Sequence, residues 1–329
     1  MNDGPDADGL LVRRACADDL AALLELLRSS MGRDQDPRFE ALFRWKHEQN
    51  AFGPSPMWVA CDGARLVGLR VFMRWEFTRG AAAFRAVRAV DTATHPDYQG
   101  RGIFTRLTLG ALPDLTDEGV DFVFNTPNDK SRPGYLKMGW RALGRLPASI
   151  RPTAMSRLAS LRGARAAASH WSETITWGVD PMRALDDVEA VDTLVASRRS
   201  ASALRTRLDA KVLAWRYGTP LLGYRAVLLG SSVADGVAFV RLRTRRDARE
   251  VVLALALVPG DDRSKLSALI RLVVSAARAD ADYLLALGRP PRFVPLPSLG
   301  PVLTTRTLAT DAPSSGRDFA LTLGDVELF

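Results

Sequence analysis

The sequence has few of the residues that cross-links and metal sites need. It contains two cysteines and three histidines in 329 residues. Cys16 and Cys61 fall in different predicted elements and lack the spacing of a metal-binding motif, so we expect both to be small core residues. With only His47, His95 and His170 present, a histidine-rich metal site is excluded. We therefore expect no metal cofactor.

Long hydrophobic runs are also missing. The longest, Val251 to Val258, is far shorter than the roughly 20 residues that a bilayer-spanning helix needs. Met1 to Gly9 is acidic and glycine-rich, without the basic and apolar regions of a secretory signal. A hydrophobic content of 47% with 25% charged residues is typical of a globular chain, and 329 residues suit two domains. We expect a soluble cytoplasmic protein with no membrane partner.

Lysine is scarce although the chain is basic. The formal net charge is +8 and the pI is about 10.0, and nearly all of the positive charge comes from arginines scattered among acidic residues. Such a charge raises the question of nucleic-acid binding, but no recognition motif accompanies it. We therefore expect no nucleic-acid partner. The arginine excess is better explained by genomic composition bias together with a site for an anionic cofactor.

The most informative segment is the loop Gln99–Phe104, which follows the apolar run Ala89–Thr94. A β-branched, alternating stretch enters a turn with two glycines and leaves as an amphipathic helix. The apolar positions of that helix are Leu107, Leu109, Ala111, Leu112 and Leu115. Glycine lets a backbone pass close to an anion, while unpaired amides and the helix dipole attract negative charge. The pattern predicts a loop that binds pyrophosphate.

One Gly-x-Gly turn also fits a purely structural connection between a strand and a helix. A second segment, Asn128–Trp140, favours the functional interpretation because it contains Asn...Tyr-x-Lys-x-Gly-Trp. Together the segments resemble the GNAT superfamily of acyl-CoA-dependent N-acyltransferases, whose motif Gln/Arg-x-x-Gly-x-Gly/Ala corresponds here to Gln99–Phe104. Phe104 departs from that motif, because it replaces the final small residue.

The resemblance covers about residues 10–150 and implies an α/β (α+β) fold, a mixed sheet flanked by helices whose central strands splay apart to admit pantetheine. The expected element order agrees with it. In chain order we expect a strand over Leu10–Arg14, a helix opened by Asp18 or Asp19, a helix over Arg38–Glu48, strands over Met57–Cys61, Leu66–Phe77 and Ala83–Thr94, the loop and its helix, a strand over Val120–Asn125 and a short helix ending near Lys137.

The second half repeats the first in degenerate form, which indicates an internal duplication. The matching segments are Leu42–Lys46 with Val212–Arg216, Leu66–Phe72 with Val233–Phe239, Thr94–Pro96 with Leu257–Pro259, and Asp121–Phe124 with Asp282–Leu285. The second half has Asp262–Lys265 in place of the glycine loop, with an added carboxylate that would repel phosphate. We expect this copy to be catalytically inactive.

We therefore expect two tandem GNAT-like mixed-sheet domains. A catalytic N-acetyltransferase domain would span residues 1–152, a linker 153–173 and a degenerate GNAT-like domain 174–329. Within the linker, Ser156–Ser169 is rich in alanine and arginine with almost no acid. It is interpreted as an exposed linker helix, and a basic surface that contacts a partner is the alternative.

The resemblance implies that acetyl-CoA is the co-substrate, held by the first copy. The residues implied to bind it through backbone amides in the loop are Gln99, Gly100, Arg101, Gly102, Ile103 and Phe104. The edge of the preceding strand would pair with the pantetheine amides through Thr92, Ala93 and Thr94. Asn128 would contact the cofactor or an ordered water.

Two residues are candidates for proton transfer. Tyr135 would protonate the departing thiolate, because a phenol is protonated at neutral pH; its alternative role is packing under the sheet. Asp91 is the only acid on the strand that leads into the loop, so it is the candidate for removing the amine proton, directly or through water. Asp91 could instead face Arg88, and bulk water could serve as the base.

The expected reaction is direct transfer of an acetyl group to a primary amine of a small molecule or peptide. The sequence leaves the acceptor, the acyl chain length and the oligomeric state open. We expect acceptor recognition by Arg38–Phe52 and by a cleft between the copies, with Trp45, Trp58 and Trp75 mostly in the core. The alternatives are a non-catalytic acyl-CoA-binding regulator and a peptidoglycan-type transferase that uses aminoacyl-tRNA, although the intact loop argues against the latter.

Overall fold

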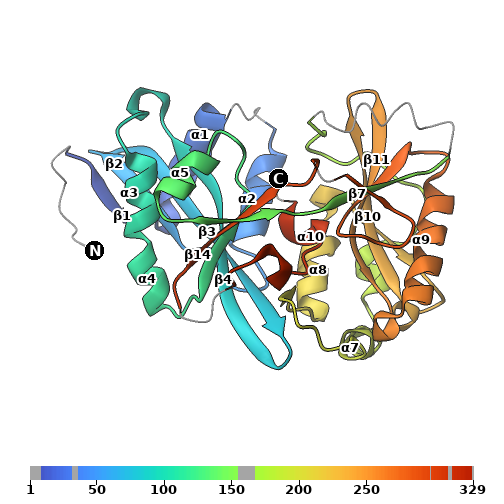
Figure 1. The fold of residues 1–329 in the computed structure, drawn as a ribbon. Helices are drawn as coiled ribbons and strands as arrows, with labels where there is room; N and C mark the ends of the chain where they lie inside the picture. Colours follow the sequence, from blue (N-terminus) through green and yellow to red (C-terminus); the bar gives the residue numbers. More distant parts are fainter. Residues whose placement is uncertain (1–8, 32–35, 155–166, 297, 310–312, 328–329) are drawn as a thin grey trace. The chain divides into compact units, whose positions relative to one another are not determined.

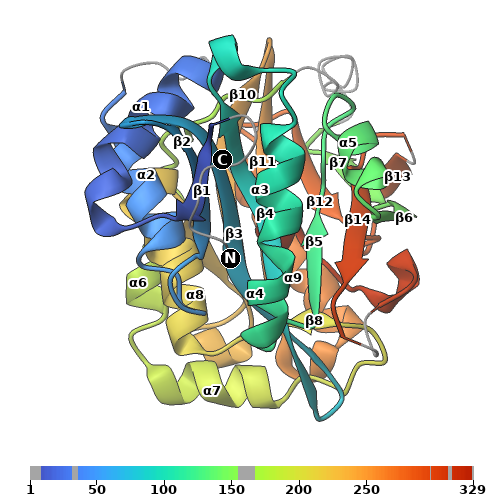
Figure 2. The same ribbon diagram turned by 90° about the vertical axis from the view of Figure 1, so that its left-hand side faces the viewer.

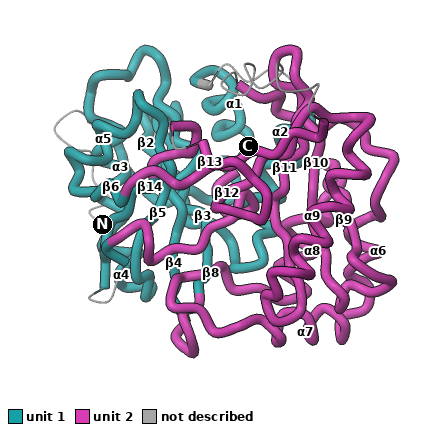
Figure 3. Tube along the Cα trace, turned by 45° about the vertical axis from the view of Figure 1, so that its right-hand side comes forward, with its two compact units in different colours: residues 1–77, 83–143, 303–314 teal, residues 78–82, 144–302, 315–329 magenta. Residues whose placement is uncertain are grey.

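A computed structural model describes residues 9–31, 36–154, 167–296, 298–309 and 313–327 (Figure 1). Most of the expected linker helix, at 155–166, lies outside the described residues. The chain divides into two compact units, and each unit combines segments that are far apart in the sequence (Figure 3). The first unit comprises residues 1–77, 83–143 and 303–314, and the second comprises residues 78–82, 144–302 and 315–329.

A mixed sheet forms the centre of the first unit. Its strand order is β1 (Leu11–Arg14), β2 (Met57–Asp62), β3 (Arg65–Arg79), β4 (Ala82–Thr94), β5 (Phe122–Asn125), β14 (Val302–Thr307) and β6 (Arg141–Arg145). β1 and β3 pair with β2 in antiparallel fashion, whereas β4 and β5 are parallel. The predicted strands of this unit are confirmed to within a few residues, because alternating apolar residues are a local signal that the sequence carries directly.

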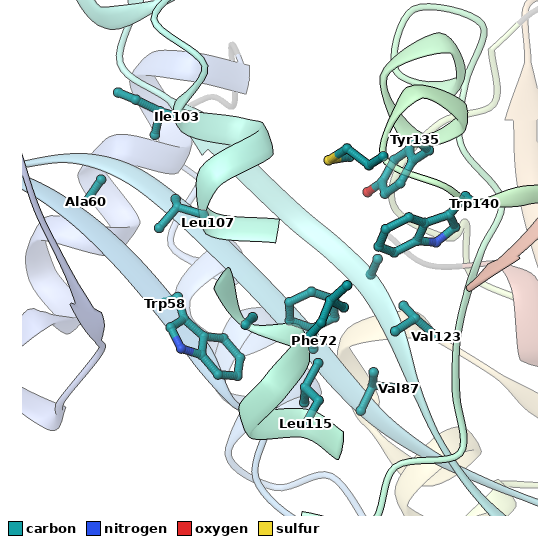
Figure 4. Packing of buried hydrophobic residues seen from close by; sticks show 14 of the residues in the cluster. Trp58, Ala60, Phe72, Val87, Ile103, Leu107, Leu115, Val123, Tyr135 and Trp140 are labelled. Atoms are coloured by element: carbon teal, nitrogen blue, oxygen red, sulfur yellow. The ribbon is translucent and has the colours of Figure 1, made fainter. Parts of the chain in front are cut away.

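Helices cover both faces of the first sheet. α1 (Leu20–Met31) and α2 (Arg38–His47) contribute Leu23, Leu27 and Phe43 to a core cluster on one face. α3 (Ile103–Gly110) and α4 (Leu112–Asp117) run along the other face (Figure 2). The apolar side chains under α3 and α4 are shown in Figure 4. A further short helix, α5 (Arg132–Lys137), carries Tyr135 into the same cluster.

The sequence predicts one amphipathic helix after the glycine loop, but the structure contains two. α3 ends at Gly110 and α4 begins at Leu112, with Ala111 as the cap residue between them. Pro113 lies in the first turn of α4 and has no backbone N–H to continue the hydrogen bonds of α3. Of the apolar positions in this segment, Leu109 is exposed.

The second unit has its own mixed sheet. Its strand order is β13 (Val294–Leu296), β7 (Ala148–Pro152), β12 (Tyr283–Leu287), β11 (Ala248–Leu257), β10 (Val237–Arg245) and β9 (Arg225–Leu228). β11 and β12 are parallel, and the neighbouring pairs are antiparallel. α9 (Arg263–Ala277) packs on this sheet through Leu269, Ile270 and Val273. The remaining elements include α6 (Pro181–Ala184), α7 (Val188–Ala196), β8 (Arg205–Thr206), α8 (Ala210–Gly218) and α10 (Leu323–Val326). The expected fold class, two mixed sheets with flanking helices, is confirmed.

Each sheet contains a strand that comes from a distant part of the chain. β14 pairs with β5 in the first unit, where the Thr304 hydroxyl donates a hydrogen bond to Asn125 Oδ1 at 2.5 Å. β7 pairs with β12 in the second unit, with Ile150 opposite Leu285. Neither sheet is therefore complete within one contiguous stretch of sequence. None of the described helices is long and apolar enough to cross a membrane.

Candidate active site

The glycine loop has a backbone that favours glycine at two positions. Gly100 has φ 80° and Gly102 has φ 73°, a region that other L-residues rarely adopt. A Cβ atom added at either position would meet nothing within 4 Å. Gly102 is the N-cap of α3, and the loop from Gln99 to Gly102 is exposed. The loop therefore presents bare backbone to open space at the start of a helix.

The amides of this loop have no partner in the described part of the chain. The backbone N–H groups from Gly100 to Thr105 donate to no described acceptor, and no side chain caps α3. The first hydrogen bond that closes the helix runs from the Arg106 N–H to the Gly102 carbonyl at 3.0 Å. Several unpaired donors and the positive end of a helix dipole thus converge at one place. This arrangement suits an anionic group such as a pyrophosphate.

Gly68 on β3 allows α3 to begin close to the sheet. A Cβ atom at this position would lie 2.5 Å from Cγ2 of Ile103, well inside van der Waals contact. Ile103 is the first residue of α3 and is buried in the core cluster. Gly68 therefore positions the glycine loop at the start of α3, although the sequence reasoning did not identify it. A glycine inside an otherwise apolar strand was the available signal.

Tyr135 is buried, with 5% of its surface exposed, and its ring lies beside Trp140 at a centroid distance of 5.4 Å (Figure 4). The phenol oxygen accepts a hydrogen bond from Nη1 of Arg70 at 2.8 Å. The same Nη1 atom donates to the hydroxyl of Thr92 on β4. The structure thus joins two of the expected site residues through Arg70, which the sequence reasoning missed. An arginine inside the apolar run of β3 was the signal that could have revealed it.

Phe104, which departs from the family motif, packs edge-to-face on Tyr135 with a centroid distance of 5.3 Å. Its ring occupies the space beside Gly134, where a Cβ atom would lie 3.1 Å from Cε1 of Phe104. Gly134 therefore accommodates the large side chain. Phe104 forms one wall around Tyr135 and leaves the loop amides free.

Asp91 lies on β4 at a positive φ of 39°, and only 5% of its side chain is exposed. Its Oδ2 atom accepts hydrogen bonds from the Lys46 ammonium and from Nε2 of His47, the latter at 2.8 Å. His47 Nδ1 lies 3.0 Å from Oγ of Ser55. Lys46 and His47 belong to α2, so Asp91 contacts the helix on the face opposite the Tyr135 cluster. The sequence reasoning did not anticipate these partners. Arg88, the partner considered for Asp91, donates to the Thr126 hydroxyl at 3.0 Å.

Asn128 has a structural contact of its own. Its Oδ1 atom accepts hydrogen bonds from the backbone N–H groups of Lys130 at 3.1 Å and Ser131 at 2.9 Å, so it shapes the turn before α5. The residue is exposed. The three tryptophans expected in the core, Trp45, Trp58 and Trp75, are all buried there. Among the described residues, no group of histidine, cysteine or carboxylate side chains is arranged to hold a metal ion.

Comparison with known proteins agrees with this geometry. Residues 11–143 match the family model of the acetyltransferase (GNAT) domain. Three similar solved structures each cover 91% of this chain. They are a probable N-acyltransferase from Enterococcus faecalis (10% identity, TM-score 0.65, 73% of its length covered), a GCN5-related N-acetyltransferase from Anabaena variabilis (11%, 0.61, 73%) and one from Kribbella flavida (16%, 0.55, 72%).

A comparison with curated protein sequences finds no match. The structural likenesses, all at low identity, show a shared fold that extends over both units. The family match covers the glycine loop and Tyr135, the two features on which the resemblance was first inferred. Residues 11–143 are therefore similar to an acetyltransferase domain of the GNAT type.

Proposed function

We propose that this protein is an acyl-CoA-dependent N-acyltransferase that moves an acetyl group from acetyl-CoA directly to a primary amine of a small molecule or peptide. The observation that carries the proposal is the uncapped start of α3, where Gly100 and Gly102 hold unpaired amides against open space. The GNAT match over residues 11–143 supports the reaction class.

In this proposal the first unit holds acetyl-CoA. The amides from Gly100 to Phe104 bind the pyrophosphate. The expected amide of Gln99 is not available, because the Gln99 N–H already donates to the Pro96 carbonyl at 3.3 Å. The strand end Thr92–Thr94 pairs with the pantetheine amides, in the manner of an added strand. Asn128 uses its side-chain amide group, because its Oδ1 atom already accepts hydrogen bonds from the turn before α5.

Proton transfer falls to Tyr135 and Asp91. Tyr135 protonates the departing thiolate, as the general acid. Asp91 or a water molecule removes the proton of the amine. The Asp91 carboxylate already accepts hydrogen bonds from Lys46 and His47, which favours transfer through water.

We further propose that the second unit is a degenerate copy of the first. The same contact recurs where each parallel strand pair begins. Asp121 Oδ2 accepts from the Arg85 N–H at 2.7 Å, and Asp282 Oδ2 accepts from the Arg249 N–H at 2.8 Å. In both units a short 3-10 turn and helical segments connect the two parallel strands, α3 and α4 in the first unit and α9 in the second.

In the second unit a side chain caps the N-terminus of the corresponding helix, α9, whereas no side chain caps α3 in the first unit. Asp262 is the N-cap of α9, and its carboxylate accepts a hydrogen bond from the Lys265 N–H at 2.8 Å. That backbone hydrogen bond holds the pKa of Asp262 below its ordinary value. A fixed negative charge therefore occupies the position that a phosphate would take, and we expect one acetyl-CoA site per chain.

Titration calorimetry with acetyl-CoA tests this proposal. We expect about one molecule bound per chain and loss of binding in Gly102→Glu, because the new carboxylate would repel the pyrophosphate. Gly260→Glu in the second copy is a matched control, since Gly260 also has a positive φ of 64° and open space around it. This control should bind normally. A stoichiometry near two, or normal binding by Gly102→Glu, would contradict the proposal.

A screen of amines with acetyl-CoA, followed by thiol release, identifies the acceptor. It should include aminoglycosides, polyamines, amino sugars, amino acids and peptides. Turnover with at least one amine is expected. Tight binding of acetyl-CoA without turnover on any amine would favour a non-catalytic acyl-CoA-binding regulator instead.

A further inference from the structure

Arg70 is a buried charge without a carboxylate partner in the described chain. Its exposed fraction is 0%, and it forms no ion pair with any described residue. Its Nε and Nη2 atoms also have no described hydrogen-bond acceptor. Burying an uncompensated charge costs desolvation free energy. We therefore expect a buried arginine only where other contacts offset that cost or where its charge has a function.

The second unit contains a cluster in which two largely buried arginines face a carboxylate. Arg243 and Arg245 donate to the two carboxylate oxygens of Glu250, at 2.7 Å and 2.9 Å. The Tyr283 hydroxyl donates to the same carboxylate at 3.0 Å. In that cluster the negative charge is permanently present. No equivalent carboxylate faces Arg70 among the described residues.

What surrounds Arg70 instead is a set of aromatic rings. The guanidinium carbon lies 4.7 Å from the ring centre of Phe72, 5.3 Å from that of Tyr135 and 5.7 Å from that of Phe104. The negative faces of aromatic rings attract a cation only weakly compared with a carboxylate. Of these three side chains, only Tyr135 can become an anion, by losing its phenol proton.

The hydrogen bond between Arg70 and Tyr135 has a fixed direction. A guanidinium has donors and no acceptor, so at the 2.8 Å contact Nη1 donates and the phenol oxygen accepts. The O–H hydrogen of Tyr135 must then point away from Arg70. It is left available for another acceptor.

We propose that Arg70 is a positioning residue for this reaction. It enables Tyr135 to act as the general acid, because it orients the O–H group of Tyr135 and stabilises the phenolate that forms. The inference rests on the proposed function. Its second contact, with the Thr92 hydroxyl on β4, ties the acid to the strand assigned to pantetheine. The charge of Arg70 then meets its counter-ion only while the phenol proton is transferred.

The step balances in atoms and electrons. The amine nitrogen bonds to the thioester carbonyl carbon, and the carbon–sulfur bond breaks with its electron pair left on sulfur. The phenol proton of Tyr135 moves to that sulfur and gives the free thiol of CoA. The surplus proton of the amine goes to Asp91 or water, and solvent returns a proton to the phenolate.

Two variants of the full chain test the inference. Arg70→Met keeps bulk and removes the charge, and Arg70→Lys keeps the charge. With acetyl-CoA and the acceptor found by the amine screen, we expect Arg70→Met to lower kcat about 100-fold with little change in the KM for acetyl-CoA. Arg70→Lys should recover part of the loss. Arg241→Met, another fully buried strand arginine but in the second unit, should retain kcat.

Two further measurements separate this role from simple packing. p-Nitrophenyl acetate releases a phenolate that needs no proton, so Arg70→Met should use it nearly as well as the unmodified protein. Tyrosine labelled with ¹³C at Cζ gives an NMR signal for Tyr135, assigned by its loss in Tyr135→Phe. That signal should shift in Arg70→Met and stay closer to its original position in Arg70→Lys, because Cζ senses the hydrogen bond to the phenol oxygen.

The inference is overturned if Arg70→Met leaves the Cζ signal of Tyr135 unmoved, leaves kcat unchanged or affects KM alone. It is also overturned if Arg70→Met loses equal activity with acetyl-CoA and with p-nitrophenyl acetate. If Arg70→Met does not fold, Arg70→Lys decides by the same readouts, because it should keep measurable turnover. Failure of the unmodified protein to turn over any amine overturns the proposed function and this inference with it. An active unmodified protein with an equally active Arg70→Met overturns the inference alone.

Discussion

Asp91 Oδ2 lies 2.8 Å from Nε2 of His47, inside a nearly solvent-free cluster that also contains Lys46. The carboxylate thus accepts hydrogen bonds from two neighbouring residues of α2, although 44 residues separate Asp91 from His47. This contact gives Asp91 a structural role, in addition to the role as base that we propose for it. The two roles can be separated by experiment.

We expect Asp91→Asn to lower the free energy of unfolding by about 3–5 kcal/mol, because it removes the carboxylate that faces the buried Lys46. The double variant Lys46→Met with Asp91→Asn should recover most of this stability. Denaturant unfolding measures the stability, and thiol release measures the activity. A stable but inactive double variant would support a role for Asp91 in proton removal. Full activity in a stable double variant would assign the base to water.

Tyr135→Phe should lower kcat by about 10²- to 10⁴-fold and leave acetyl-CoA affinity nearly intact, because the hydroxyl acts on the departing thiolate and not on the bound thioester. Steady-state kinetics and calorimetry together measure the two effects. Tyr283→Phe removes a buried tyrosine hydroxyl of the second unit and serves as the control, with kcat expected to stay the same. A loss confined to KM would mean that Tyr135 only shapes the pocket.

Gly68→Val should destabilise the protein by about 1–3 kcal/mol, because the added side chain collides with Ile103 at the start of α3. Acetyl-CoA binding should weaken as well, since the displaced helix carries the loop. Gly110→Ala lies in the same helix with nothing within 4 Å of the added Cβ, and it should be neutral or slightly stabilising. Thermal unfolding and calorimetry compare the variants. Equal stability of both variants would show that α3 does not depend on this close approach.

The ion pair between Arg13 and Asp19 predicts a loss of stability in acid. The two side chains form paired hydrogen bonds, both at 2.7 Å, and these lower the pKa of Asp19 from 3.8 to about 2. A carboxyl whose pKa is lower in the folded state stabilises the fold above its unfolded pKa, and this contribution disappears as the pH falls through about 2. The free energy of unfolding should therefore fall between about pH 4 and pH 2 more steeply than in Asp19→Asn. Identical slopes in the two proteins would exclude this ion pair as a cause.

A fragment that ends after Pro152 should be unstable, because it lacks β14, the strand that pairs with β5. Its β7 segment would also lack the partners β12 and β13. Joining residues 301–309 to the fragment through a flexible linker should restore part of the stability. Circular dichroism on heating compares the two. A fragment of residues 1–152 that unfolds cooperatively at the temperature of the whole protein would contradict this expectation.

The sequence alone determined the elements that depend on neighbouring residues. Alternation predicted the strands β1 to β5 of the first unit but not β6 or β14, and the glycines at positions 100 and 102 predicted a bare turn before a helix. These features follow from backbone preferences and from periodicity, both of which operate over a few residues. Local signals failed where Pro113 interrupted an apolar pattern that continued past it, and at Cys16, which was expected in the core but is exposed.

The tertiary structure decided which distant side chains meet. Arg70 reaches Tyr135 across 65 residues of sequence, and Thr304 reaches Asn125 across 179. Nothing in the local pattern specifies such pairs, because they depend on strand order and on which face of a sheet each side chain takes. The resemblance identified Tyr135 as a candidate acid from its spacing, whereas the buried guanidinium that holds its phenol became visible only once β3 and α5 were folded together. Folding brings the two residues together because burial of the apolar face of the sheet packs α5 against β3. The sequence indicates this burial only as a pattern of apolar residues and does not specify which side chains meet.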